Sequence, residues 1–216
     1  MNLIVRDYLP TFQKAEKSLV IVIDPGHGGN DPGKVGTNDA LEKDINLSIA
    51  IKLKSYLEMQ GITVIMTRET DDALYKEGVK NKKKSDLQER VRLCNESDAA
   101  LVISIHQNSY QTENCRGAQV FYFDESTEGK DLAGYIQQSM ALNVDAENNR
   151  EIKANSSYFL LKETAVTTVI VECGFLSNPA EADLLINEEY QTKIAYGIHA
   201  GVVAYLEKMM EEDEVK

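Results

Sequence analysis

The stretch VIVIDPGHGG, residues 20–29, joins a run of β-branched side chains to an acid, a proline and a histidine set among glycines. The apolar run from Leu19 to Ile23 predicts a buried strand that ends at Asp24-Pro25. A hairpin here would need only Asn-Gly or Gly-Gly, and a phosphate loop would need a lysine and other glycine spacings. We therefore expect His27 to bind a ligand at the end of a core strand, with its glycine neighbours allowing close backbone approach.

The rest of the chain alternates predicted strands with predicted helices. Further buried strands are expected over residues 62–67, 99–105, 118–123 and 167–171, and a short strand over 157–161. Helices are expected from residue 44, from a capping box at Ser85 to Gln88, around 130–142, and twice after Asn178-Pro179. This order predicts an α/β fold, a single layered domain with a mostly parallel twisted sheet of about six strands and helices on both faces.

Composition and charge exclude several classes of protein. The chain has 35 acidic against 23 basic residues and a net charge of −12, the opposite of a phosphate-binding surface, so we expect no nucleic-acid partner. Its three cysteines form neither a CxxC pair nor an even set, which disfavours a disulfide framework. No stretch approaches the roughly 18 apolar residues that a membrane span needs. Residues 1–18 are too polar for a signal peptide, so the chain is either cytosolic or begins after a removed export segment.

Polar side chains stand at the ends of three predicted strands. His27 follows the first strand, His106 follows the third, and Glu172 follows the last. Ligands of open α/β sheets gather at the carboxyl ends of the strands. These side chains should therefore converge at one edge, provided that the three strands are parallel neighbours.

Two of the three histidines in the chain occupy these strand ends, which favours a shared metal ion. Zinc accepts imidazole nitrogen and carboxylate oxygen, and catalytic zinc sites use three protein ligands. Glu42, just before the first helix, is the best placed third ligand beside His27 and His106. An ordinary acid in the first turn of a helix explains Glu42 equally well on spacing alone. His199, inside the last helix, is interpreted as a structural histidine.

Glu172 follows four apolar residues in VIVECGF, where burial is costly unless a partner compensates. Close to zinc, this carboxylate can accept the proton of a water and then deliver it to a leaving amine. The alternative is a structural carboxylate that caps a turn or pairs with an arginine such as Arg68 or Arg90. Cys173 has no histidine beside it in sequence, which disfavours a nucleophilic cysteine.

Four further residues are candidates for supporting roles. Asp24 would either hydrogen-bond a ligand histidine or brace the glycine loop. Asn108, Arg68 and Arg90 are candidates for substrate contact, although each is more typical of a structural hydrogen-bonding group.

Four blocks of the sequence, IDPGHGGND, LEKDINL, SIHQNS and VECGFLSNPAEADLL, resemble the zinc-dependent N-acetylmuramoyl-L-alanine amidases of the type 3 family. They stand in the family's order, and the likeness runs from about Leu19 to Leu206. The stretches KSDLQERVRLCNESDAALVISIH and SYFLLKET are most similar to the sporulation branch, the germination-specific CwlD amidases. The resemblance implies one zinc ion held by His27, Glu42 and His106, with Glu172 as the catalytic carboxylate.

The resemblance also implies an activity and a setting. The reaction would be hydrolysis of the amide between the lactyl group of N-acetylmuramic acid and L-alanine of the peptidoglycan stem peptide, in spore-cortex remodelling that forms muramic-δ-lactam and is needed for germination. A zinc peptidase or carboxypeptidase acting within the stem peptide, and a wall-binding module without catalysis, are the alternatives. The place would be extracytoplasmic, in the cell wall or between the forespore and mother-cell membranes, with an export or anchor segment missing from the chain.

Some relatives carry an inserted helix that plugs the zinc site. Here core elements fill the spans between the expected zinc ligands, so we hypothesise that a regulatory or activating protein partner restrains or activates the enzyme. These expectations divide the chain into an N-terminal extension over residues 1–18, a catalytic domain over 19–208 and a solvated acidic tail over 209–216.

Overall fold

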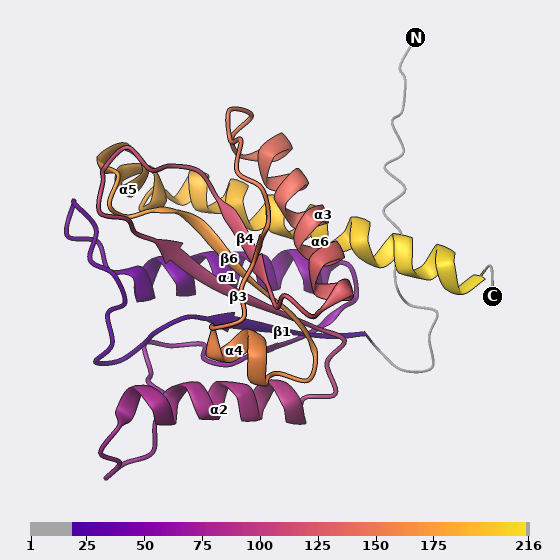
Figure 1. Ribbon diagram of the computed structural model, residues 1–216, viewed down its shortest axis with the longest axis horizontal. Coiled ribbons are helices and arrows are strands. Elements are labelled where there is room, and N and C mark those ends of the chain that lie inside the picture. Colours follow the sequence, from indigo (N-terminus) through magenta and orange to yellow (C-terminus); the bar gives the residue numbers. More distant parts are fainter. Residues whose placement is uncertain (1–18, 215–216) are drawn as a thin grey trace.

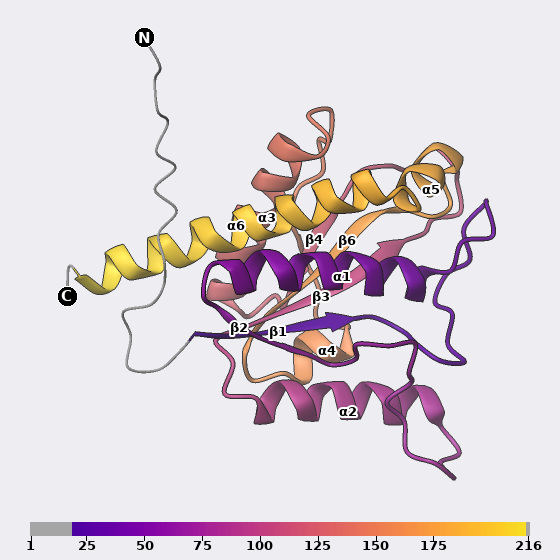
Figure 2. The same ribbon diagram turned by 180° about the vertical axis from the view of Figure 1, so that it is seen from behind.

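The computed structural model describes residues 19–214, so the N-terminal extension expected over residues 1–18 lies outside the described part. Figures 1 and 2 show a central sheet covered by helices on both faces. Helices α1 (Glu42–Met59), α3 (Thr127–Asn143) and α6 (Glu188–Glu214) cover one face, and α2 (Lys82–Glu96) and α4 (Phe159–Glu163) cover the other. The remaining helix, α5 (Pro179–Leu185), leads into α6. None of the helices in residues 19–214 combines the length and apolarity needed to cross a membrane.

The sheet has the strand order β2-β1-β3-β6-β4-β5. Its strands are β1 (Val20–Pro25), β2 (Thr63–Met66), β3 (Leu101–Asn108), β4 (Gln119–Tyr122), β5 (Lys153–Ala154) and β6 (Thr167–Phe175). β2, β1, β3 and β6 are parallel to one another, whereas β4 is antiparallel to β6. This topology confirms the predicted α/β fold, and it makes β1, β3 and β6 the adjacent central strands that convergence at one edge requires.

The core is divided between the two faces of the sheet. The larger cluster packs the strands against α1, α3 and α6, and the smaller one joins Val22 and Val102 to Cys94 of α2 and Leu160 of α4. At the crossing of α3 and α6 the backbones approach closely. A Cβ added at Gly201 would lie 2.6 Å from Cα of Ile136. Glycine is therefore what allows these two helices to pack at this distance.

The antiparallel direction of β4 sends a loop across the end of β6. Residues 109–118 leave β3 and enter β4 at the same edge of the sheet. Three hydrogen bonds join this loop to residues 177–181: Tyr110 N donates to Ser177 Oγ, Asn178 Nδ2 to Glu113 O, and Gly117 N to Glu181 Oε1. The loop therefore borders the carboxyl ends of the central strands.

Two local predictions are wrong. The segment 157–161 is not a strand, because Asn155 Oδ1 accepts hydrogen bonds from the backbone of Ser157 and Tyr158 in a turn that leads into α4. The short strand β5 lies just upstream of it. Helix α2 begins at Lys82 rather than at a capping box from Ser85, because Asn81 Oδ1 accepts from Lys84 N at 3.0 Å.

Two further predictions need correction at the edges of the fold. The strand predicted over residues 62–67 is β2, whose side chains alternate between exposed and half-buried because it is an edge strand. At the other end of the chain, α6 continues to Glu214, so most of the expected acidic tail is helical.

Candidate metal centre

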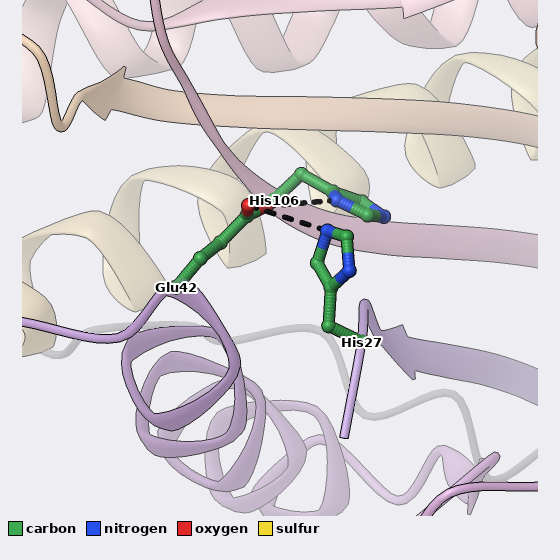
Figure 3. A group of neighbouring side chains, drawn as sticks. All are labelled: His27, Glu42 and His106. Atoms are coloured by element: carbon green, nitrogen blue, oxygen red, sulfur yellow. Dashed lines mark hydrogen bonds and ion pairs between the residues drawn. The ribbon is translucent and has the colours of Figure 1, made fainter. Parts of the chain in front are cut away.

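Three side chains from three elements meet at the carboxyl edge of the sheet (Figure 3). His27 follows β1, Glu42 is the first residue of α1, and His106 lies in β3. The Glu42 carboxylate lies between the rings, with Oε2 3.2 Å from His27 Nε2 and Oε1 3.0 Å from His106 Nδ1. One ligand atom from each residue lies within 4.8 Å of the others. Two imidazole nitrogens and a carboxylate oxygen at this spacing fit a zinc ion, whose catalytic sites use three such ligands.

Glycines leave the space that these side chains occupy. A Cβ at Gly26 would lie 2.1 Å from His106 Cε1, and one at Gly33 would lie 2.5 Å from Glu42 Oε2. Any larger residue would therefore displace a ring or the carboxylate. His27 itself has φ of 62°, in the left-handed region that side-chain-bearing residues seldom adopt.

Asp31 orients the His27 ring, a role that sequence analysis did not assign. The ring N–H at Nδ1 donates to Asp31 Oδ2 over 2.9 Å, which leaves Nε2 directed at Glu42. Carboxylates commonly fix the tautomer of metal-binding histidines in this way. The only sign of this contact in the sequence is that Asp31 is an acidic residue four positions after His27.

Glu42 is 2% exposed and is held by backbone donors as well as by the histidines. Lys34 N donates to Oε2 at 2.7 Å and Gln107 N donates to Oε1 at 3.0 Å. Burial favours the neutral carboxyl group, but hydrogen bonds and charge from the two histidines hold the pKa of Glu42 well below its usual range. Burial likewise disfavours protonated His27, and Glu42 and Asp31 outweigh it and raise the pKa of His27. The site is thus built around an anionic carboxylate.

Glu172 shares a cavity of about 490 Å³ with His27, Glu42 and His106. It is the register partner of His106 on the neighbouring strand β6. Both residues lie inside their strands rather than after them, because β3 and β6 continue to Asn108 and Phe175. Among the described residues, Glu172 Oε2 has no hydrogen-bond partner.

Burial raises the pKa of Glu172 to about 7; the histidines oppose this shift and the charge of Glu42 reinforces it. The side chain is only 8% exposed. A carboxylate with this pKa can both accept and return a proton near neutral pH. Tyr158, which precedes α4, lines the same cavity. It was missed because its segment was interpreted as a strand.

The other candidates lie behind the cavity wall or on it. Asp24 bonds neither ligand histidine; it accepts from Arg90 Nη1 at 2.6 Å, and also from Thr67 and Ser104. Arg68 and Arg90 are 4% and 2% exposed, and their donors are directed at backbone carbonyls and carboxylates. Neither guanidinium group pairs with Glu172, and both brace the backbone around His27 instead. Arg90 also lines the cavity, and contact of either arginine with substrate stays a prediction. Asn108 lines the cavity, and its contact with substrate stays a prediction.

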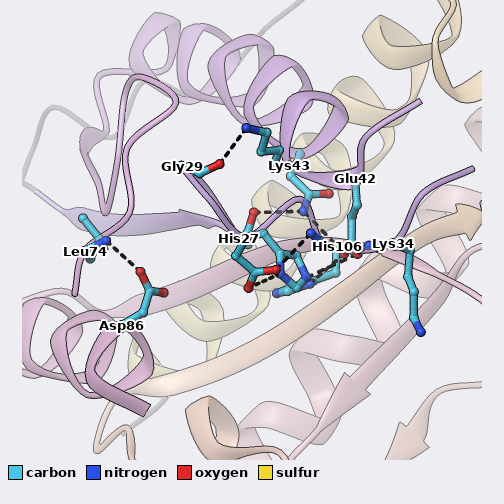
Figure 4. A network of polar contacts seen from close by, with 12 residues as sticks. His27, Gly29, Lys34, Glu42, Lys43, Leu74, Asp86 and His106 are labelled. Carbon is cyan, nitrogen blue, oxygen red and sulfur yellow. Dashed lines mark hydrogen bonds and ion pairs between the residues drawn. The ribbon is translucent and has the colours of Figure 1, made fainter. Parts of the chain in front are cut away.

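Polar contacts also tie the His27 loop to its surroundings (Figure 4). Lys43 Nζ donates to Gly29 O at 2.8 Å and bridges to Asp71. Leu74 N donates to Asp86 at 2.7 Å, which holds the segment after β2 against α2. The loop is therefore fastened to α1, and the segment beside it to α2.

The sequence and the fold are similar to those of a known protein family, of curated proteins and of solved structures. A model of the family described as N-acetylmuramoyl-L-alanine amidase, Amidase_3, matches residues 21–204. The germination-specific N-acetylmuramoyl-L-alanine amidase of Bacillus subtilis is 42% identical over 189 residues, which cover 86% of this chain and 79% of the relative. The amidase LytC of the same organism is 33% identical over 187 residues, 86% of this chain and 35% of LytC. Among solved structures, the CwlD amidase from Clostridioides difficile, in complex with the GerS lipoprotein, has a TM-score of 0.85 and 40% identity, and the match covers 88% of this chain and 99% of that one.

Proposed function

Because this chain belongs to the Amidase_3 family of N-acetylmuramoyl-L-alanine amidases, we propose that it cleaves the amide between the lactyl group of N-acetylmuramic acid and L-alanine with one zinc ion. His27, Glu42 and His106 are the proposed ligands, and Glu172 is the proposed catalytic carboxylate. The observation that carries this proposal is the meeting of three ligand atoms within 4.8 Å in the cavity that Glu172 also lines.

A zinc ion in this position supplies Lewis-acid polarisation of the scissile carbonyl and lowers the pKa of a coordinated water. The protein holds the ligand geometry. Asp31 keeps His27 Nε2 turned inward, and the backbone amides of Lys34 and Gln107 fix the two carboxylate oxygens of Glu42. His27 and Glu42 thus each have a further contact that restrains them, as in metal sites whose affinity depends on such support.

Glu172 moves the proton in the proposed reaction. Its carboxylate accepts a proton from the attacking water, and the protonated form then donates that proton to the departing amine of L-alanine. Burial supports both steps, because it raises the pKa of Glu172 to about 7 and makes its two forms similar in free energy near neutral pH. The antiparallel strand β4 borders Glu172 on the side opposite β3, with Gln119 as its register partner.

We further propose a role in spore-cortex remodelling, with removal of stem peptides preceding muramic-δ-lactam formation. The 42% identity to a germination-specific amidase supports this setting, as does the likeness to CwlD. A peptidoglycan substrate supports a location outside the cytoplasm for this enzyme. The solved CwlD was captured with the GerS lipoprotein, which supports a regulatory or activating protein partner for this chain as well.

The proposal is tested on purified peptidoglycan and isolated muropeptides by mass spectrometry of the products, with zinc content measured in parallel. We expect release of stem peptides that carry a free L-alanine amine, with the lactyl carboxylate left on the glycan. Glu172→Ala should retain zinc and lose activity, whereas His27→Ala should lose both.

Three results would contradict the proposal. Cleavage between amino acids would identify a peptidase, and binding without product release would identify a wall-binding module. Unchanged turnover in Glu172→Ala would remove the assigned role of that carboxylate.

A further inference from the structure

Two buried guanidinium groups hold three consecutive backbone carbonyls around His27. Arg68 Nε donates to Pro25 O at 3.0 Å, and Arg68 Nη2 donates to Gly26 O at 3.0 Å. Arg90 Nη1 donates to Pro25 O at 2.8 Å, and Arg90 Nη2 donates to His27 O at 2.6 Å. We call this arrangement the carbonyl clamp. It fixes the direction of three successive peptide groups immediately before and at a proposed metal ligand.

The carbonyl clamp holds a backbone segment that is in an unfavourable conformation. His27 has φ of 62°, and a residue with a side chain in this left-handed region carries strain that its surroundings must offset. Charge-assisted hydrogen bonds to buried carbonyls are among the stronger polar contacts in proteins. They are well suited to hold His27 in this conformation and so to direct its ring at Glu42.

Neither arginine lies on an element that carries a proposed metal ligand. Arg68 follows β2, and Arg90 lies in α2. Arg68 Nη2 also donates to Lys43 O at 2.8 Å, next to Glu42 in α1. One guanidinium thus sets the His27 loop relative to the helix that supplies the carboxylate.

Arg90 is itself held in place by two carboxylates. Its Nη1 donates to Asp24 Oδ1 at 2.6 Å, and its Nε donates to Asp86 Oδ2 at 2.7 Å. Asp24 is 1% exposed, and it also accepts from Thr67 Oγ1 and Ser104 Oγ. The planar fork of arginine reaches both carboxylates and both carbonyls at once, which the single ammonium group of lysine cannot do.

We propose that Arg68 and Arg90 are positioning residues that impose the left-handed backbone of His27 and thereby set the affinity of the site for zinc. This inference rests on the metal ligands of the proposed function. It adds a role for two arginines that form no hydrogen bond or ion pair with the side chains of the proposed metal ligands or of Glu172. Loss of such outer support around a metal site typically costs 10- to 100-fold in affinity.

The test compares Arg90→Lys with Arg92→Lys, a matched control on the exposed side of the same helix, where Arg92 pairs with Glu89 and Glu96. The first readout is metal-free. The chain has three histidines, so imidazole NMR of the ¹⁵N-histidine-labelled protein should resolve His27, His106 and the internal reference His199. We expect the His27 signals to shift or broaden in Arg90→Lys and the His199 signals to stay unchanged.

The second readout is the zinc dissociation constant, measured by competition with a chromogenic chelator. We expect it to rise about 10- to 100-fold in Arg90→Lys and to stay within about twofold in Arg92→Lys. The free energy of unfolding of each metal-free variant is measured in urea, because a merely structural role for Arg90 would lower it without changing the His27 signals.

If Arg90→Lys does not fold, the double variant Asp24→Asn/Arg90→Gln replaces it. It removes both members of the buried Asp24–Arg90 pair together, and the Asp86 carboxylate that loses its partner is partly exposed to solvent. The proposal would be overturned if the variant that folds had both the His27 signals and the zinc affinity of the wild type. If the wild-type protein binds no zinc, the metal assignment fails by itself, and the imidazole spectra of the metal-free proteins still decide whether the arginines position His27.

Discussion

Gly26 lies against the His106 ring. A Cβ there would lie 2.1 to 2.7 Å from three atoms of that ring, so a methyl group forces the ring to move. We expect Gly26→Ala to weaken zinc binding at least tenfold, as measured by chelator competition, because a ligand displaced by about 1 Å no longer fits a tetrahedral site.

Gly134→Ala is the matched control for this change. Gly134 lies in α3, and an added Cβ there meets nothing within 4 Å. Alanine at that position should leave zinc affinity unchanged and add about 0.5–1 kcal/mol of stability, since alanine favours the helix. A wild-type zinc affinity in Gly26→Ala would contradict this prediction, because it would show that the His106 ring can accommodate a Cβ at residue 26.

Glu172 should make the metal-free protein less stable at neutral than at acid pH. Its pKa rises from 4.5 to about 7 on folding, so the native state binds the proton more tightly than the unfolded chain does. The resulting stabilisation is complete below pH 4.5 and is lost as the pH rises through about 7. Glu172→Gln removes this dependence. The variant should be more stable than the wild type at pH 8, by on the order of 1–3 kcal/mol.

Urea unfolding with chelator present, between pH 4.5 and 8, measures this difference. The gap between Glu172→Gln and wild type should widen toward neutral pH, and the surface substitution Glu125→Gln serves as the control. A gap that is constant with pH would mean that the carboxyl group titrates normally in the folded protein.

His27, His106 and Glu172 could be predicted because each one stands next to a readable strand, whereas Glu42 was separated from an ordinary acid of a first helical turn only by the family resemblance. The β-branched runs before His27, His106 and Glu172 indicate buried strands, and parallel neighbours bring their ends together. Asp31 could not be assigned, since its contact depends on how the glycine loop turns back on itself. Arg68 and Arg90 could not be assigned either, because nothing in a sequence shows which carbonyls a buried guanidinium will find.

At the scale of elements, the start of α2 depends on Asn81. Its side chain accepts from Lys84 N at 3.0 Å, whereas Ser85 already lies within α2 and its Oγ accepts from Lys76 N at 3.3 Å. We expect Asn81→Ala to lower the free energy of unfolding by about 1 kcal/mol and Ser85→Ala to lower it by less. Denaturant titration of both variants measures this order, and the reverse order would restore the capping box at Ser85.

The wrong strand prediction over residues 157–161 has a physical cause. A short apolar run such as SYFLL fits a strand or a helical turn equally well by its periodicity. The choice is made by Asn155, whose side chain caps the turn, and by Phe121 and Ile170, which bury Leu161 from neighbouring strands. These are tertiary contacts, whereas long elements such as α1 and α3 carry enough periodic residues to be predicted from sequence.

At the scale of the whole molecule, the packing of α3 against α6 depends on Gly201. An added Cβ would meet backbone atoms of Ile136 at 2.6 and 2.9 Å, and backbone cannot move aside without shifting the helix. We expect Gly201→Ala to cost about 1–3 kcal/mol of stability despite the better helix propensity of alanine.

Gly197→Ala, one turn earlier in α6, provides the comparison. There the nearest atoms are the side-chain tips of Met140 and Val144 at 3.0 Å, which can rearrange. This variant should be close to neutral in thermal and urea unfolding. Equal losses of stability in Gly201→Ala and Gly197→Ala would mean that the loss of glycine's backbone flexibility, rather than the close approach of the two helices, explains both effects.

The loop over residues 109–118 has a consequence for how such an enzyme diversifies. It begins and ends at the same rim and is fastened by hydrogen bonds to residues 177–181, while the proposed zinc ligands belong to other segments. The loop can therefore differ in length and in side chains, provided that the residues that form these hydrogen bonds are kept. Grafting this segment between relatives would change the rim of the cavity and leave His27, Glu42, His106 and Glu172 in place.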